Sequence, residues 1–161
     1  MADARLLHRL ILVFIFVGIA FSLYAGWEAG AHYYQSCSPN SVVSCAKVDT
    51  SQYSNFTVLG VTVYDWQLGL AGFIILLAID IPFFWTYDAR YLPPLIGFAL
   101  IGLGIAVTFG AIETFLIGAF CPVCLGAYIS DIGVLTGALL LWRMHRAQET
   151  ERLQRQAAAP G

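Results

Sequence analysis

Charged side chains are scarce in this sequence, since Asp, Glu, Lys and Arg make up only 11% of its 161 residues. Soluble domains average about 25%, and 59% of this chain is hydrophobic, so the composition excludes an ordinary soluble protein and indicates an integral membrane protein. The net charge of -2 gives no electrostatic basis for binding nucleic acid. Internal repeats, low-complexity tracts and an appended soluble domain are also lacking, so we expect a single membrane domain.

Four apolar segments are each long enough to cross a bilayer, which takes about 20 residues. They cover about residues 6–27, 66–85, 95–117 and 122–142. The sequence therefore predicts an all-α membrane protein. We expect a four-helix transmembrane bundle over residues 1–143, with a long outer loop between the first two spans that has room for a short interfacial helix. Residues 144–161 mix both charge signs and predict a frayed cytoplasmic tail.

The first apolar segment shares its basic start with signal peptides. It is long, however, and the residues from Trp27 to His32 make a poor cleavage site. We therefore interpret it as an uncleaved span, with His8 and Arg9 as anchors at the lipid headgroups.

Basic residues gather on one side of the predicted membrane. Seven of the eight lie before or at the start of span one, between spans two and three, or after span four, and only Lys47 lies between spans one and two. Because cytoplasmic segments collect Lys and Arg, we expect both termini in the cytoplasm. The loop cysteines and the start of span four would then meet at the outer face, where disulfides are chemically permitted.

The four cysteines form two pairs, Cys37 with Cys45 in the outer loop and Cys121 with Cys124 at the start of span four. Pro122 suits the first position of a helix, which puts Cys121 at the N-cap and Cys124 in the first turn. The positive end of the helix dipole stabilises a thiolate there. The i, i+3 spacing also brings the two sulfur atoms close enough to bridge. Paired thiols in this position indicate redox chemistry.

Polar residues continue along the same helix face. Tyr128 and Asp131 follow Cys124 at i+4 and i+7, deeper in the membrane. An acid at this depth is by default a functional candidate, and a phenol and a carboxyl group beside a thiolate suit a lipid-soluble oxidant, although a core aromatic explains Tyr128 equally well. Glu113, near the outer end of span three, either delivers protons to the cysteines or snorkels to the interface. Asp80, near the inner end of span two, lies far from the thiols, and we interpret it as structural.

Other uses of four cysteines have different requirements. Covalent haem attachment needs a His directly after the second Cys, and Leu125 stands there, so this use is excluded. A zinc site needs four converging thiolates with a gap of about two to four residues in each pair, and the gap between Cys37 and Cys45 is wider, so we expect no metal. Two structural disulfides in a membrane scaffold remain open as the alternative to a thiol oxidoreductase.

The order of these motifs resembles the vitamin K epoxide reductase family, including its bacterial and archaeal members. Two loop cysteines precede a Cys-x-x-Cys that opens the last of four spans, and residues 44–53, Ser-Cys-Ala-Lys-Val-Asp-Thr-Ser-Gln-Tyr, are similar to the family stretch Cys-x-Lys-Val-x-x-Ser-x-Tyr. Residues 58–61 followed by Gly69 resemble the entry to its second span, and Tyr128 stands where the family has a quinone-contacting tyrosine. The resemblance covers about residues 23–140 and weighs strongly against inert disulfides.

The resemblance implies a role for each cysteine. Cys124 would be the thiolate that reacts with a quinone of the ubiquinone, menaquinone or vitamin K type. Cys121 would exchange disulfides with Cys45. Cys37 would take electrons from a soluble thioredoxin-fold partner of the DsbA type. The outer loop would have to move between these exchanges.

The resemblance also implies a quinone site, with Tyr128 as the first candidate to donate a hydrogen bond to the quinone, followed by Asp131, Asp65 and Glu113. Ser51 resembles a family position near the active cysteines. Asp65 stands where vertebrate members carry an asparagine that hydrogen-bonds the substrate. This departure, together with the lack of an endoplasmic-reticulum retrieval signal, favours a disulfide-generating enzyme of a prokaryotic plasma membrane. The alternative is a eukaryotic-type reductase of vitamin K epoxide or vitamin K.

Overall fold

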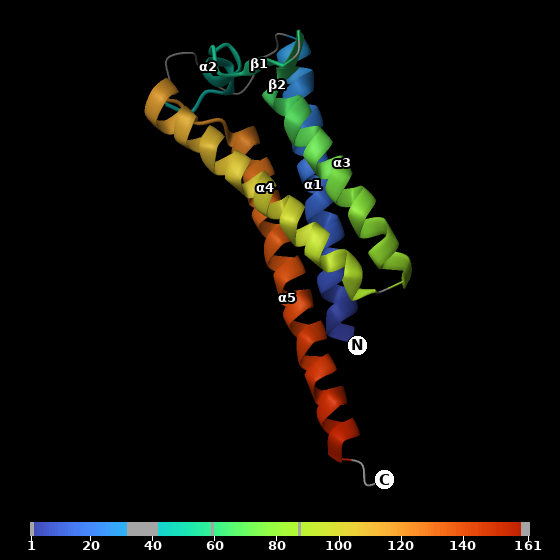
Figure 1. Cartoon of the computed structure of the whole chain (residues 1–161). Coiled ribbons are helices and arrows are strands. Elements are labelled where there is room, and N and C mark those ends of the chain that lie inside the picture. The colour runs from blue at the N-terminus through green and yellow to red at the C-terminus, as the bar shows by residue number, and fades with distance from the viewer. Residues whose placement is uncertain (1, 32–41, 59, 87, 159–161) are drawn as a thin grey trace.

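The computed structural model describes residues 2–31, 42–58, 60–86 and 88–158, and it is mainly helical. Four helices in this part of the chain are long and apolar enough to cross a membrane, as the sequence predicts. They are α1 (Ala2–Ala31), α3 (Asp65–Thr86), α4 (Leu92–Ala111) and α5 (Pro122–Ala158). The start of α1, the end of α5 and the α3–α4 connection lie at one end of the bundle, which we name the inner end (Figure 1).

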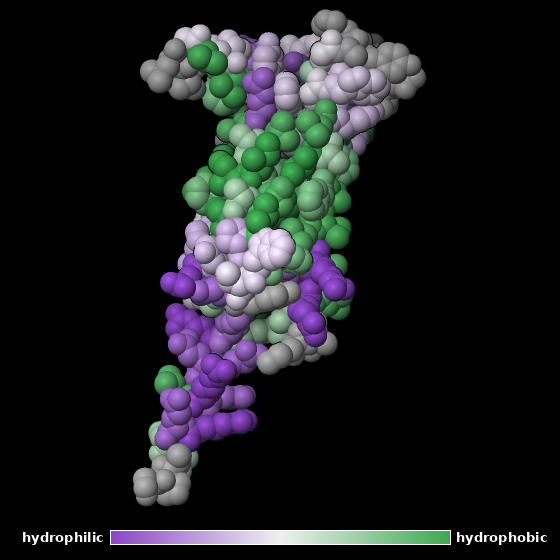
Figure 2. Space-filling view, turned by 90° about the vertical axis from the view of Figure 1, so that its right-hand side faces the viewer, coloured by the Kyte–Doolittle hydropathy of each residue, from purple (hydrophilic) through white to green (hydrophobic). Residues whose placement is uncertain are grey.

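Shorter elements complete the fold. The helix α2 (Cys45–Asp49) and the strands β1 (Asn55–Val58) and β2 (Val61–Tyr64) lie at the opposite, outer end. The short turn η1 (Ala89–Tyr91) precedes α4, and the π-helical turn η2 (Ile112–Ile117) follows it. Figure 2 shows a hydrophobic band around the middle of the molecule, with hydrophilic residues over the tail of α5. This pattern fits a protein that spans a bilayer.

Two helix ends differ from the prediction. Helix α4 begins at Leu92 and includes Pro93 and Pro94 in its first turn. Proline is tolerated there because the N–H groups of the first helical turn have no carbonyl partner within the helix, so the N–H group that proline lacks is not needed. Helix α5 continues to Ala158, so the prediction of a frayed tail is wrong. Its last turns contain Arg, Gln, Glu, Leu and Ala, which are good helix formers.

The outer segment holds a short β-hairpin, so the prediction of an all-α chain is wrong in this detail. Strands β1 and β2 pair antiparallel from Asn55 with Tyr64 to Val58 with Val61. Gly60 has a φ of 82°, a conformation that tight hairpin turns require and that glycine adopts without strain. Valine and threonine dominate both strands, and β-branched residues favour extended backbone.

Helix α2 begins where the outer segment is tied to the start of α5. Ser44 is its N-cap, and the side chain of Ser44 accepts a hydrogen bond from the Lys47 N–H. The Ser44 N–H donates to the carbonyl of Phe120 at 3.0 Å, and the Phe120 N–H donates to the carbonyl of Val42 at 2.7 Å. These bonds place Cys45 directly above the N-terminus of α5.

Glycines on α5 let α1 pack closely against it. An added Cβ would lie 2.5 Å from the Phe21 ring at Gly126, 2.6 Å from the Phe14 ring at Gly133 and 2.6 Å from Ile11 at Gly137. The glycines of α4 differ from one another. At Gly102 such an atom would lie 2.9 Å from Asp131 Oδ1, whereas at Gly97 and Gly104 nothing lies within 4 Å.

The inner end of the bundle contains a buried ion pair. His8 and Asp80 are both 0% exposed, and His8 Nε2 lies 3.0 Å from Asp80 Oδ2. The ring of Phe83 packs edge-on against the His8 ring at 5.1 Å. The interpretation of His8 as a headgroup anchor is therefore wrong, because its partner is on α3. The interpretation of Asp80 as structural agrees with this pairing.

Candidate active site

A disulfide joins the outer segment to the core of the bundle. Cys45 is the first residue of α2 and Cys121 is the N-cap of α5, and their Cα atoms lie 4.4 Å apart. Both residues are buried. The exchange partners implied by the family resemblance are therefore bonded to each other. The alternative bridge between Cys121 and Cys124, which the spacing permits, is not formed, and Cys37 lies outside the described residues.

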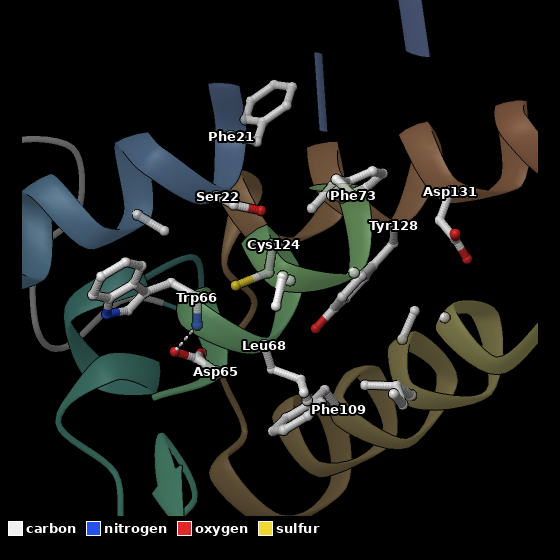
Figure 3. A pocket seen from close by; sticks show the side chains of 18 of the residues that line it. Phe21, Ser22, Asp65, Trp66, Leu68, Phe73, Phe109, Cys124, Tyr128 and Asp131 are labelled. Atoms are coloured by element: carbon white, nitrogen blue, oxygen red, sulfur yellow. Dashed lines mark hydrogen bonds between the residues drawn. The ribbon is translucent and has the colours of Figure 1, made fainter. Parts of the chain in front are cut away.

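Cys124 is a free thiol. It occupies the first turn of α5, as predicted from Pro122 at the first helical position. The Cys121 carbonyl accepts the N–H of Leu125 at 3.0 Å, which starts the helix one residue before the proline. The Cys124 side chain lines a cavity between the helices (Figure 3). A thiol in this position meets whatever molecule enters the cavity.

The cavity has a volume of about 270 Å³ and receives side chains from all four long helices. Most of its lining is apolar. The polar lining residues are Ser22, Asp65, Cys124, Tyr128 and Asp131, and the larger apolar ones are Phe21, Trp66, Leu68, Phe73, Ile75, Leu76, Phe98, Ile101, Ile105 and Phe109. The predicted shared face of Cys124, Tyr128 and Asp131 is confirmed, because all three line this one space. An apolar cavity with a few polar groups is typical of sites for small ligands.

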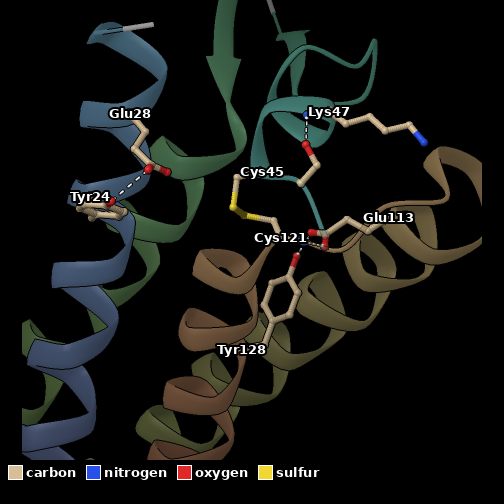
Figure 4. Close-up of a disulfide and its surroundings, with 8 residues drawn as sticks. Tyr24, Glu28, Cys45, Lys47, Glu113, Cys121 and Tyr128 are labelled. Carbon is tan, nitrogen blue, oxygen red and sulfur yellow. Dashed lines mark hydrogen bonds between the residues drawn. A yellow bond between two sulfur atoms is a disulfide. The ribbon is translucent and has the colours of Figure 1, made fainter. Parts of the chain in front are cut away.

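Glu113 connects the disulfide to the cavity. It lies on the π-helical turn η2 and is 2% exposed. Its Oε2 atom accepts the Cys121 N–H at 3.2 Å, and its Oε1 atom accepts the Tyr128 hydroxyl at 2.9 Å. Figure 4 shows the carboxyl group between these two residues, beside the disulfide. The alternative of a snorkelling carboxylate is wrong, because Glu113 points into the bundle. π-Helical turns often occur at functional sites.

Asp65 is held at the outer rim of the cavity. Its N–H donates to the Ser54 carbonyl at 3.0 Å, and its Oδ1 atom accepts the Trp66 N–H at 2.7 Å. Ser51, by contrast, does not line the cavity. Its hydroxyl oxygen accepts the Tyr53 N–H at 3.3 Å, so it stabilises the turn that leads from α2 to the hairpin.

Asp49, at the end of α2 outside the spans, adds to the acidic groups of the outer end. Burial, and to a smaller extent the nearby charges of Asp65, Glu28 and Glu113, raise its pKa from 3.8 to about 7. Among the described residues, no group of three or more His, Cys, Asp and Glu side chains has the arrangement of a metal site.

Several functional neighbours have no signal in the sequence. Ser22 and Trp66 line the cavity, yet neither belongs to a motif. The buried Glu28 accepts a hydrogen bond from the Tyr24 hydroxyl at 2.9 Å, and its place at the end of α1 reads in sequence as an ordinary interfacial acid. The surroundings of these residues depend on contacts between helices, which the local sequence does not show.

Comparison with known proteins identifies the family. The model of the vitamin K epoxide reductase family matches residues 9–139, which include all four cysteines and most of the four long helices. A search of curated proteins gives no match. Members of this family are membrane oxidoreductases that act with quinones. With a matched region of this length, four spans and paired cysteines at one end, the chain belongs to the vitamin K epoxide reductase family.

Proposed function

We propose that this protein takes electrons from a thioredoxin-fold dithiol outside the cytoplasm and passes them to a quinone, so that disulfides form in the partner. One observation carries the proposal. The free thiol of Cys124 lines an apolar cavity, three residues from a cysteine that is bonded to the outer segment. Electrons that arrive at the outer cysteines therefore have a covalent route to the cavity.

The relay consists of thiol–disulfide exchanges. The thiolate of Cys45 attacks Cys121 in a Cys121–Cys124 disulfide, so that a Cys45–Cys121 bond forms and Cys124 leaves as a thiolate. This is the bonding pattern of the structure. Cys37 then attacks Cys45, which forms the Cys37–Cys45 disulfide and releases Cys121. The partner dithiol reduces Cys37–Cys45 again and becomes a disulfide.

The last exchange reduces the quinone. Cys121 and Cys124 close to a disulfide and give up two electrons, which the quinone accepts together with two protons to become a hydroquinone. Tyr128 is the hydrogen-bond donor of the cavity that is already connected to an acid, since its hydroxyl bonds to Glu113. Glu113 takes up the proton that a thiol loses, and the hydroxyl of Tyr128 passes a proton to the quinone oxygen.

The cavity suits a quinone headgroup. Its apolar lining fits the ring, and its polar side chains provide hydrogen bonds that fix the orientation of the ring. It is bounded by helices that span the bilayer, where quinones are dissolved. The distribution of basic residues supports an outer location for the cysteines, and Asp65 in the position of the vertebrate asparagine supports the plasma membrane of a prokaryote.

The replacement Cys124→Ser tests the proposal most simply. Purified protein in detergent is mixed with a reduced thioredoxin-fold partner and a ubiquinone or menaquinone analogue, and quinone reduction is followed by absorbance. We expect complete loss of quinone reduction, because no thiol remains in the cavity. Leu125→Ala is the matched control, since Leu125 is 39% exposed on the adjacent face and its removal should leave the rate unchanged. Quinone turnover retained in Cys124→Ser would contradict the assignment.

The replacement Cys37→Ser tests the outer end of the relay. We expect it to block oxidation of the protein partner and to leave quinone reduction by dithiothreitol largely intact, because the small reductant reaches the inner cysteines directly. Equal loss of both activities would count against an outer shuttle.

A further inference from the structure

Asp131 is the polar group of the cavity farthest along α5 from Cys124 (Figure 3). It is 6% exposed. Its Oδ2 atom has no hydrogen-bond partner among the described residues, and the ion pairs described in this structure involve other acids. A buried polar atom that is left without a partner costs free energy. An incoming ligand that supplies the missing partner is therefore favoured.

Gly102 of α4 provides the space in which the carboxyl group lies. A Cβ atom added at Gly102 would come within 2.9 Å of Asp131 Oδ1 and 3.2 Å of Oδ2. A larger residue at position 102 would thus displace the Asp131 carboxyl group. This displacement costs little, because the carboxyl group is the end of a flexible side chain. At Gly104, on the same helix, nothing lies within 4 Å of an added Cβ atom. These two glycines form a matched pair, of which one touches the acid.

Only the neutral form of the Asp131 carboxyl group donates a hydrogen bond. A carboxylate inside the membrane is costly without a basic partner, whereas the neutral group carries one O–H donor. Asp131 is seven residues from Cys124, which corresponds to about 10 Å along the helix axis. A quinone ring that meets Cys124 in the shared cavity therefore lies between the thiol and the carboxyl group, with its far edge toward Asp131.

We propose that Asp131, seated on Gly102, recognises acceptor oxygens on the far edge of the quinone ring and selects dimethoxybenzoquinones over naphthoquinones. This inference rests on the proposed quinone function. A thiol attacks a carbon–carbon double bond of the quinone ring. In a naphthoquinone the available bond lies opposite the fused ring, so the fused ring with its C–H groups faces Asp131. In a dimethoxybenzoquinone two ether oxygens occupy the corresponding edge and accept the O–H.

The test compares two soluble headgroups, dimethoxy-methylbenzoquinone and methylnaphthoquinone, with dithiothreitol as the reductant and full-length protein in detergent. The measured quantity is the ratio of kcat/KM for the benzoquinone to kcat/KM for the naphthoquinone. We expect Asp131→Leu to lower this ratio about tenfold, mainly through KM of the benzoquinone, which corresponds to one lost hydrogen bond. Asp131→Asn should keep most of the preference, because its amide N–H also donates.

The glycine pair provides a second, independent test. Gly102→Ala should lower the ratio in the same direction by displacing the carboxyl group, and Gly104→Ala should leave it at the wild-type value. If Asp131→Leu does not fold, Gly102→Ala still decides the question. A ratio unchanged in Gly102→Ala and, where it folds, in Asp131→Leu would overturn the role of Asp131 alone. Failure of the wild-type protein to reduce either quinone would instead overturn the proposed function.

Discussion

At the inner end of the bundle Asp80 is paired with His8 at 3.0 Å, and both are fully buried. At the outer end Glu113 is equally well buried but bonds to uncharged groups, the Cys121 N–H and the Tyr128 hydroxyl. The inner acid has a base beside it and aromatic rings around it, whereas the outer acid lies beside a disulfide and, through Tyr128, a cavity.

The difference separates two uses of a buried acid. A buried acid that is bonded to a base contributes to stability, because removal of either side chain leaves the other without its partner in a medium of low polarity. An acid with neutral partners gains or loses a proton without breaking such a pair. We therefore assign Asp80 to stability and Glu113 to proton exchange, and the following replacements test this assignment.

The largest expected effect belongs to the inner pair. Asp80→Leu leaves His8 buried without its acid and should lower the free energy of unfolding by about 3–5 kcal/mol, as the loss of one partner of a buried pair does. The measurement is thermal unfolding in detergent. The double replacement His8→Leu with Asp80→Leu is the control and should regain most of the loss. If Asp80→Leu is as stable as the wild type, the pair does not have the structural role assigned to it.

Glu113→Gln should give the next largest effect, on rate instead of stability. The amide oxygen accepts the Cys121 N–H and the amide nitrogen donates to the Tyr128 oxygen, so the local geometry is kept. Proton exchange is lost, and quinone reduction should fall about 100-fold, the typical contribution of a positioned acid or base. Quinone kinetics and a melting curve are measured on the same sample. An unchanged rate, or a loss of rate accompanied by an equal loss of stability, would contradict the assignment.

Tyr128→Phe sharpens the same comparison. The ring remains and the hydroxyl is lost, so the connection between Glu113 and the cavity is interrupted. We expect a decrease in kcat of about tenfold, equivalent to the loss of one hydrogen bond, at a nearly constant midpoint of unfolding. If Tyr128 is only a core aromatic, kcat will stay at the wild-type value.

The smallest effect is expected at Asp49, as a dependence of stability on pH. Its pKa in the folded protein is about 7 instead of 3.8, so between these values the folded state binds more protons than the unfolded state. Stability then falls as pH rises through this interval. In Asp49→Asn the fall between pH 5 and pH 8 should be smaller by a few degrees in the melting temperature, whereas Glu151→Gln, an exposed acid on the tail of α5, should behave like the wild type. Equal slopes in all three proteins would contradict this role.

Much of the outer site follows from spacing along one helix. Pro122 predicts that α5 starts there, and the i+4 and i+7 positions place Tyr128 and Asp131 on the face of Cys124, as found. Four apolar runs predict four membrane helices. These features depend on local sequence and helix geometry, which can be inferred without knowledge of neighbouring helices.

Contacts between distant segments could not be predicted in this way. The ion pair of His8 with Asp80 joins residues 72 positions apart, and a His near the start of a span reads locally as an interfacial anchor. The packing of Phe21 on Gly126 also depends on how α1 crosses α5. The hairpin has no clear signal in the sequence, because strands of four residues each are too short for an alternation of polar and apolar residues.

The central claim is that the thiolate of Cys124 delivers electrons to a quinone in the cavity. Its most direct test is the absorbance spectrum of purified Cys37→Ser protein after addition of a quinone, because without Cys37 the Cys45–Cys121 disulfide is not resolved and Cys124 stays free. We predict a long-wavelength charge-transfer band between thiolate and quinone. The band should be absent from the double variant with Cys37→Ser and Cys124→Ser, and it should be present in the double variant with Cys37→Ser and Leu125→Ala. A band that persists without Cys124, or no band while quinone is bound, would contradict the claim.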